Sequence, residues 1–291
     1  MASMWLLLAV SVLWALSFGL ITRVSALGAP FVAAVRTVLA AAVFLPFVRA
    51  RGMGARQALG LAAIGALQFG IMYVLYFQSY RWLHASEVAL FTIFTPLFVT
   101  FADGALARRL SWIFLATATL AVAGTGICLW TSLDRPGILL GFLLMQLSNA
   151  CFALGQVLYR RAAPRTGRTD RELMGVLYAG AAVVALATAL PGTRWDKVVQ
   201  MTPGQAGILV YLGVVASGLG FFMFNAGARR TDVGTLAVLN NAKVPLAILA
   251  SALVFGEKVD WGRTLAGGLV IAGALALNGW LARARPGVQM E

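Results

Sequence analysis

Acidic residues and histidine are scarce in this sequence, which holds ten Asp and Glu residues and one histidine, His84, among 291 residues. Cys128 and Cys151 each lie inside an apolar run, so they are expected to be small buried hydrophobes and not a disulfide. No group of these residues has metal-ligand spacing, and the motifs HExxH and GxSxG do not occur. These absences argue against a metal centre, a cofactor site and a catalytic nucleophile, so the sequence does not predict an enzyme.

Apolar residues make up 60% of the chain, charged residues only 11%, and the mean hydropathy is +0.86. Such values are typical of polytopic membrane proteins. The net charge of +13 would suggest nucleic acid in a soluble protein. Here the arginines gather in short clusters between apolar runs, as in loops that lie on anionic lipid. The expected partners are therefore a lipid bilayer and a small molecule, and nucleic acid is not expected.

Ten apolar runs approach the ~20 residues that a helix needs to cross a bilayer. The sequence thus predicts an all-α integral membrane protein with ten transmembrane helices. The first run lacks the basic start of a secretory signal and is expected to be a retained span. The longest linker is expected at Arg160 to Arg171. The predicted spans are 4–22, 29–48, 57–80, 85–106, 111–131, 137–158, 172–190, 205–227, 232–255 and 263–282.

The loop cations indicate an orientation. With a cytoplasmic N-terminus, fourteen loop and tail cations fall inside and seven fall outside. Cytoplasmic loops carry the excess of Lys and Arg, so both termini are expected in the cytoplasm of a bacterial cell, with the protein in the inner membrane. Arg23 alone argues the other way, because it follows the first span and nothing basic precedes it.

The two halves of the sequence resemble each other. At an offset of 149 residues, Pro96 pairs with Pro245, Trp112 with Trp261 and Gly124 with Gly273. At an offset of 148, Gly65 and Gly70 pair with Gly213 and Gly218. The pattern predicts two repeats, 1–131 and 132–291, of five helices each. An odd number of helices places the second repeat upside down, an arrangement that puts transport sites at the membrane midplane between the repeats.

The ninth predicted span carries an unusual polar group at its middle. It holds Asn240, Asn241 and Lys243 just before Pro245. A lysine at this depth costs roughly 2.5–3.5 kcal/mol against lipid, so it is expected to face a cavity. Pro245 removes a backbone donor and frees the carbonyl near Asn241. These residues are predicted to bind substrate; a helix-packing role for Lys243 is the alternative.

Other polar and aromatic side chains form stripes on the predicted helices. Gln146, Asn149, Ala153 and Gln156 share one face of the sixth span, and Gln68, Met72, Tyr76 and Ser79 share one face of the third. Such stripes suit the wall of a polar cavity, although hydrogen bonding between helices would also account for them. The further substrate candidates are Trp14, Phe18, Thr92, Thr95, Ser217 and Phe221.

The sequence resembles the drug/metabolite transporter superfamily, EamA type. The resemblance rests on Trp14-Ala-Leu-Ser-Phe18, Arg36, Phe255-Gly-Glu-Lys258 and Trp261, and it covers nearly the whole chain. Ala15, where the family often has Gly, and Ala107-Arg108, where a first-half Gly-Glu would stand, depart from its pattern. The resemblance implies ten helices in two inverted repeats around a central cavity, and an exporter of aromatic and neutral amino acids. It also makes Arg36 a recurring feature whether or not substrate touches it, so Arg36 is expected to serve packing more than substrate.

The sequence therefore predicts an exporter of small zwitterionic metabolites that works by alternating access. A carrier of anionic or phosphorylated metabolites, of the nucleotide-sugar type, is the alternative that the two membrane-embedded cations favour. Uncoupled facilitated diffusion is expected over proton-coupled efflux, because Glu87 and Asp103 lie near the ends of a span. A small multidrug carrier would need an acid at the membrane centre, which the spans lack. The sequence leaves the oligomeric state open.

Overall fold

The computed structural model describes residues 2–48, 53–108, 120, 123, 135–228 and 243–283. Within these residues the chain is helical and contains no strand. The predicted fifth span, apart from residues 120 and 123, and the first eleven residues of the ninth, which include Asn240 and Asn241, lie outside the described residues, as does the Trp112 of the sequence repeat. The principal helices are α1 Ala2–Val24, α2 Ala29–Phe44, α3 Ala55–Gly65, α4 Met72–Ser79, α5 Ala85–Phe91, α6 Thr95–Leu106, α8 Ile138–Ala162, α9 Asp170–Gly192, α10 Trp195–Val198, α11 Pro203–Val210, α12 Gly220–Ala228, α14 Lys243–Leu253 and α15 Trp261–Arg283.

Seven helical segments of the described chain are long and apolar enough to cross a membrane. Each agrees with one of the ten predicted spans to within a few residues, except at the end of the sixth. The segments are Trp5–Leu27, Ala29–Phe47, Ala55–Ser79, Ala85–Leu106, Ile138–Thr166, Asp170–Gly192 and Pro203–Gly227.

The linker expected from Arg160 to Arg171 is shorter in the structure than predicted. α8 continues to Ala162, a 3₁₀ turn follows to Thr166, and α9 begins at Asp170. Two interactions hold the polar residues of this region in helices: Arg161 pairs with Asp103 of α6 at 2.7 Å, and the Tyr159 hydroxyl bonds to the Asp170 carboxylate. The two helices therefore extend into both ends of the predicted linker, and only residues 163–169 remain between them.

Three spans are interrupted in ways that shape their inner faces. The 85–106 span breaks into α5, the 3₁₀ turn η4 (Thr92–Phe94) and α6, because Pro96 lacks the N–H that an α-helix requires. The 55–79 span contains the π-helical segment η3, Ala66–Ile71, and the 203–228 span contains η6, Tyr211–Leu219. π-helical insertions occur frequently at functional sites. The two π segments occupy corresponding places in the two predicted repeats.

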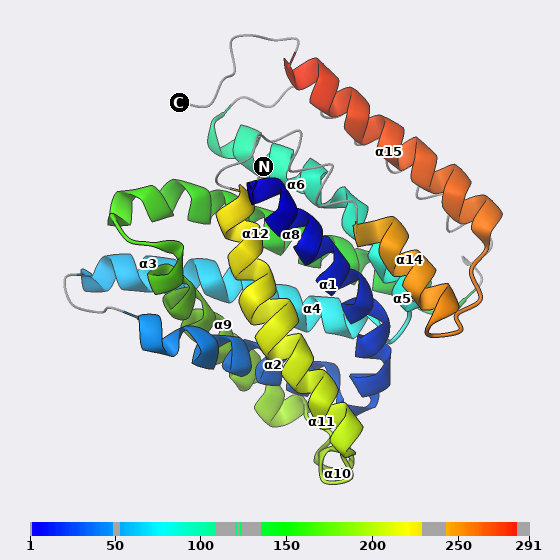
Figure 1. Ribbon diagram of the computed structural model, residues 1–291, viewed down its shortest axis with the longest axis horizontal. Helices are drawn as coiled ribbons and strands as arrows, with labels where there is room; N and C mark the ends of the chain where they lie inside the picture. Colours follow the sequence, from blue (N-terminus) through cyan, green and yellow to red (C-terminus); the bar gives the residue numbers. More distant parts are fainter. Residues whose placement is uncertain are drawn as a thin grey trace.

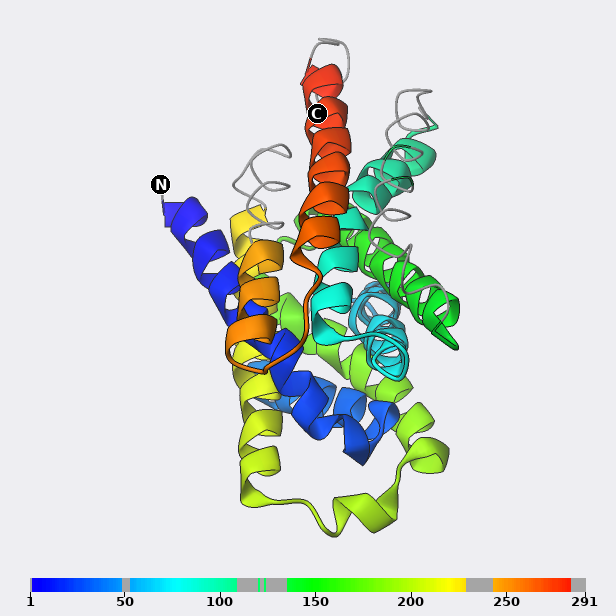
Figure 2. The same ribbon diagram turned by 90° about the vertical axis from the view of Figure 1, so that its right-hand side faces the viewer.

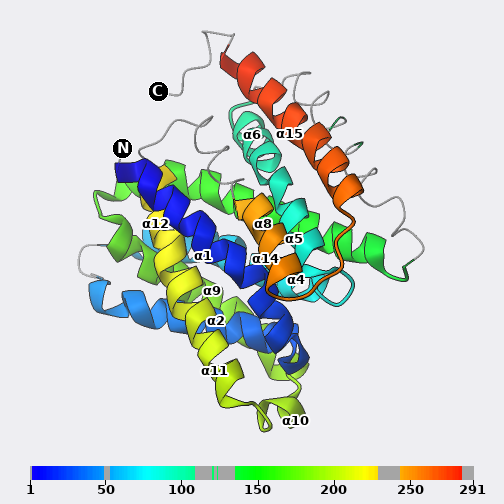
Figure 3. The same ribbon diagram turned by 45° about the vertical axis from the view of Figure 1, so that its right-hand side comes forward.

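Helices from the first half pack mainly on helices from the second half. α2 lies against α9 and η6, α1 against α12 and α14, and α4 and α6 against α8. Figure 1 shows α1, α12 and α14 crossing one face of the bundle, with α2, α4 and α9 behind them. α15 lies along the edge, near α5 and α6, in all three views (Figures 1, 2 and 3). The two halves thus pack closely together, and helices from both line the space between them.

Close contact between α3 and α9 depends on two glycines. A Cβ at Gly65 would lie 1.9 Å from the Leu177 carbonyl oxygen, and one at Gly180 would lie 1.9 Å from that of Ala62. Small residues let membrane helices approach until their backbones touch. This pair of contacts holds η3, and with it α4, against the second half of the bundle.

Candidate substrate site

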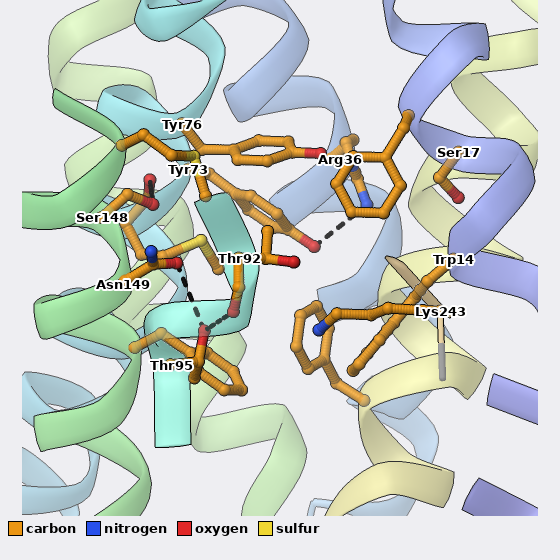
Figure 4. A pocket seen from close by; sticks show the side chains of 15 residues that line it. Trp14, Ser17, Arg36, Tyr73, Tyr76, Thr92, Thr95, Ser148, Asn149 and Lys243 are labelled. Atoms are coloured by element: carbon orange, nitrogen blue, oxygen red, sulfur yellow. Dashed lines mark hydrogen bonds between the residues drawn. The ribbon is translucent and has the colours of Figure 1, made fainter. Parts of the chain in front are cut away.

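A pocket lies between the two halves near the centre of the bundle. Helices α1, α2, α4, α6, α8, α12 and α14 and the turn η4 contribute side chains to it, and it contains about 590 Å³ of space not filled by atoms, including the part open to solvent. Figure 4 shows these side chains converging from several helices. The lining residues are Trp14, Ser17, Phe18, Arg36, Met72, Tyr73, Tyr76, Thr92, Thr95, Met145, Ser148, Asn149, Phe152, Phe221 and Lys243.

Arg36 and Lys243 make one side of the pocket cationic. They are 3% and 6% exposed, and no acidic side chain is among the described residues that line the pocket. The Lys243 ammonium lies 4.9 Å from the centre of the Trp14 ring, a distance at which cation and ring attract. Buried cations normally face a partner or a water-filled cavity. The arrangement is suited to a negatively charged ligand group.

A hydrogen-bond network fixes the direction of Arg36. Its Nε donates to the Ser217 hydroxyl at 2.8 Å, and its Nη2 donates to the Tyr73 hydroxyl at 3.1 Å. The guanidinium carbon also lies 4.5 Å from the centre of the Tyr73 ring. Ser217 in turn donates to the Leu212 carbonyl five residues earlier, an interval that the π-helical backbone of η6 makes possible. The irregular segment thus helps to place the cation.

Aromatic rings form the apolar wall. Trp14 donates from Nε1 to the Ala216 carbonyl at 2.8 Å, which fixes the indole, and its ring packs 4.7 Å from Phe221. The ring centre of Phe152 lies 5.6 Å from that of Phe221. Rings at these separations form a rigid surface that excludes water and attracts apolar ligand groups.

A polar wall stands opposite the cations, where Pro96 interrupts the span. Since Pro96 has no N–H, nearby carbonyls need other donors. The Thr95 hydroxyl donates to the Thr92 carbonyl at 2.7 Å, and the Asn149 side-chain amide donates to the Phe91 carbonyl at 2.8 Å. Proline therefore brings threonine and asparagine side chains together on the pocket surface.

One end of the pocket is closed by tyrosine contacts within the first half and by one carboxylate contact between the halves. Tyr76 and Tyr80 join through their hydroxyls at 3.0 Å, and Tyr80 donates to the Phe18 carbonyl at 3.3 Å. Beyond them, the Glu257 carboxylate accepts from the first two backbone amides of α5, each at 3.0 Å. Helix N-termini carry unpaired N–H groups and positive potential, which a carboxylate satisfies. Glu257 thereby ties the loop after α14 to the start of α5.

Eight of the fourteen residues predicted to bind substrate line this pocket. Four more, Gln68, Gln146, Gln156 and Ser217, belong to the described chain and do not line it. Gln68 is fully buried in η3 against Gly155 of α8, and Ser217 lies behind the guanidinium of Arg36. Asn240 and Asn241 lie outside the described residues. The eight are Trp14, Phe18, Tyr76, Thr92, Thr95, Asn149, Phe221 and Lys243.

On α8 the pocket face is turned relative to the predicted stripe. Met145, Ser148, Asn149 and Phe152 line the pocket, whereas Gln146 accepts a bond from Asn149 at its edge. The stripe predicted on α8 was chosen by its polar side chains, but apolar side chains such as Met145 and Phe152 also line the pocket.

The sequence did not identify several residues of the lining, among them Ser17, Tyr73, Ser148 and Phe152. Arg36 also lines the pocket, although it was expected to serve helix packing. The internal repeat held a signal for one of them: Tyr73 and Phe221 are 148 residues apart, the offset of the paired glycines, and both line the pocket.

An all-helical bundle with seven candidate spans and a pocket between its halves defines a membrane transporter. The model of the EamA-like transporter family matches residues 1–130 and 139–279, and the chain belongs to this family. The predicted resemblance is thus confirmed.

The names of similar proteins state which substrate those relatives carry. A protein named "Probable biotin transporter" from Pseudomonas aeruginosa is 41% identical over 278 residues, which cover 94% of this chain and 96% of that protein. The "Biotin transporter" of Escherichia coli K12 is 39% identical over 275 residues, covering 94% and 91%. One solved crystal structure, 23% identical, has a TM-score of 0.67 and covers 98% of this chain and 99% of its own, which supports the fold. The relatives do not support the predicted amino-acid substrate.

Proposed function

We propose that this protein carries biotin across the bacterial inner membrane by alternating access. The observation that carries the proposal is the pocket itself, in which two buried cations and no acid stand among aromatic walls in the described lining. Biotin is a monocarboxylate whose other end is an uncharged polar ring. The names of the relatives, at 39–41% identity over 94% of the chain, point to the same ligand.

The charges of the pocket favour this acid over an amino acid. An amino acid would bring an ammonium attached to the same carbon as its carboxylate. That ammonium would enter beside Arg36 and Lys243, with no acidic side chain in the described lining to pair with it. Like charges in a medium of low dielectric repel strongly. A single carboxylate, by contrast, pairs with the cations and leaves no charge unmatched on the ligand.

The proposal includes an architecture that extends the described chain. Ten spans form two inverted repeats, 1–131 and 132–291, around the pocket, and both termini are cytoplasmic. Two observations support it: the family model matches twice along the chain, and the two π segments recur at corresponding places. In this orientation the end closed by Tyr80 and Glu257 faces outward. Alternating access then requires these contacts to open while the opposite end closes.

Uptake of radiolabelled biotin into proteoliposomes tests the function. Purified protein should give saturable uptake that excess unlabelled biotin suppresses, and a panel of neutral and aromatic amino acids should not compete. Liposomes without protein measure passive entry. Competition by amino acids or by nucleotide sugars at concentrations where biotin has no effect would overturn the proposal. Counterflow between loaded and empty vesicles would separate true carriage from binding.

A further inference from the structure

We propose that Thr92, Thr95, Ser148 and Asn149, called here the acceptor wall, bind the uncharged N–H donors of the substrate. The inference rests on the proposed carriage of biotin and names the residues that select its ureido ring. It depends on which hydrogen-bonding groups of the pocket are already used by the protein.

Both threonine hydroxyls of the acceptor wall already donate their protons to backbone carbonyls. The Thr92 hydroxyl donates to the Ala89 carbonyl at 2.7 Å. The Thr95 hydroxyl has one proton, which is directed at the Thr92 carbonyl at 2.7 Å and more weakly at Asn149 Oδ1 at 3.3 Å. A hydroxyl has one donor and two acceptor lone pairs. Both threonine oxygens therefore offer the pocket only acceptors.

Ser148 and Asn149, the other two residues of the acceptor wall, also donate their protons to groups of the protein. Ser148 donates to the Met72 carbonyl at 2.9 Å. The Asn149 amide nitrogen donates both protons, one to the Phe91 carbonyl at 2.8 Å and one to Gln146 Oε1 at 3.1 Å. Asn149 therefore has only its carbonyl oxygen left for a ligand.

Donors elsewhere in the neutral lining are used as well. Tyr80 donates to the Phe18 carbonyl, so the bond between the two tyrosine hydroxyls takes the Tyr76 proton. The Trp14 N–H donates to Ala216. The donor-rich side chains of the described lining are Arg36 and Lys243, on the opposite side of the pocket from Thr95 and Asn149 (Figure 4).

The pocket is thus polarised, with cationic donors on one side and neutral acceptors on the other. Biotin has the complementary arrangement, since a flexible chain separates its carboxylate from a ureido ring with two N–H groups. Sites that hydrogen-bond a ligand group discriminate strongly against analogues that lack it, because buried polar atoms are then left unpaired. The geometry assigns the carboxylate to Arg36 and Lys243 and the ureido N–H groups to the acceptor wall.

The test compares two ligands on the same protein samples. One is biotin, and the other is its analogue with the thiolane ring, chain and carboxylate but no ureido group. Thr92→Val with Thr95→Val removes two acceptors while keeping side-chain shape. The double variant should weaken biotin binding about tenfold or more and change analogue binding less than twofold. Because both affinities come from one sample, the fraction of folded protein cancels in their ratio.

Two further variants complete the design. Thr92→Ser with Thr95→Ser keeps both acceptors and should restore the wild-type ratio. Thr100→Val is the matched control, since Thr100 lies on α6 with the same type of bond, to the Pro96 carbonyl, and does not line the pocket. If the wild type binds biotin and the valine variant loses affinity equally for both ligands, or for neither, the acceptor wall is wrong and the function stands. If the wild type does not bind biotin, both proposals fail.

Discussion

Replacing Lys243 should separate ligand binding from folding. In the proposed site, Lys243→Gln removes one of the two cations that face the carboxylate of biotin. A hydrogen bond to a charged group contributes about 1.5–3 kcal/mol, which corresponds to an affinity loss of about 10- to 150-fold. Folding should change little. The contact with the Trp14 ring, 4.9 Å away, stabilises by roughly 0.5–2 kcal/mol, and removing the desolvation cost of a side chain that is 6% exposed offsets this loss.

Equilibrium binding of biotin and of its uncharged carboxamide measures this effect. The wild type should prefer the acid, and Lys243→Gln should lower this preference by about 10- to 150-fold, which leaves the part that Arg36 supplies. Lys197→Gln, at an exposed lysine outside the pocket, is the control for loss of a lysine charge. An affinity of Lys243→Gln for biotin within twofold of wild type, with unchanged folded yield, would refute the reasoning. An equal loss for acid and carboxamide would refute it too, because charge would then not be the cause.

Three further results are expected. Gly180→Ala should lower stability by about 1–3 kcal/mol or more in thermal denaturation, because its Cβ would meet a carbonyl oxygen at 1.9 Å. Gly60→Ala, where a Cβ would have no atom within 4 Å, should be neutral, and equal effects of the two variants would contradict the close helix contact. Glu257→Ala should speed hydrogen exchange at the first amides of α5, and Lys258→Ala should not; unchanged protection would exclude the cap. Transport should need no proton partner, since no Asp, Glu or His is in the described lining; concentrative uptake driven by a pH gradient alone and abolished by a protonophore would contradict this.

The positions of the helices followed from the sequence more closely than the faces they present. Apolar length predicts a span directly, because lipid requires it. Which side chains face the pocket depends on local rotation, and η3 and η6 change that rotation without any signal in hydropathy. Gln68 shows the consequence: its polarity and its place on a stripe favoured the pocket, yet η3 buries it against Gly155.

A charged residue and a proline gave the clearest sequence signals for the position of the pocket. Lys243 was placed in the site because a lysine at membrane depth is costly against lipid, and Thr95 because it directly precedes a helix-breaking proline; both line the pocket. For Arg36 the resemblance favours packing, because it makes this arginine a recurring feature whether or not substrate touches it, and the partners that place it in the pocket lining cannot be seen in sequence. They are Tyr73 and Ser217, 37 and 181 residues away, and such distant pairs become visible only after folding.

A pocket lined by two cations and, among the described residues, by no acid suits a monoanion, and carrying one has an electrical consequence. If biotin crosses without a proton, as proposed, each transport cycle moves the charge of its carboxylate. Moving one elementary charge through 100 mV changes the free energy by about 2.3 kcal/mol, or about fiftyfold in concentration. An interior-negative potential therefore opposes entry of the anion. Net uptake through such a pocket requires the cell to hold free biotin about fiftyfold below its outside concentration, which a reaction consuming the free acid inside would do.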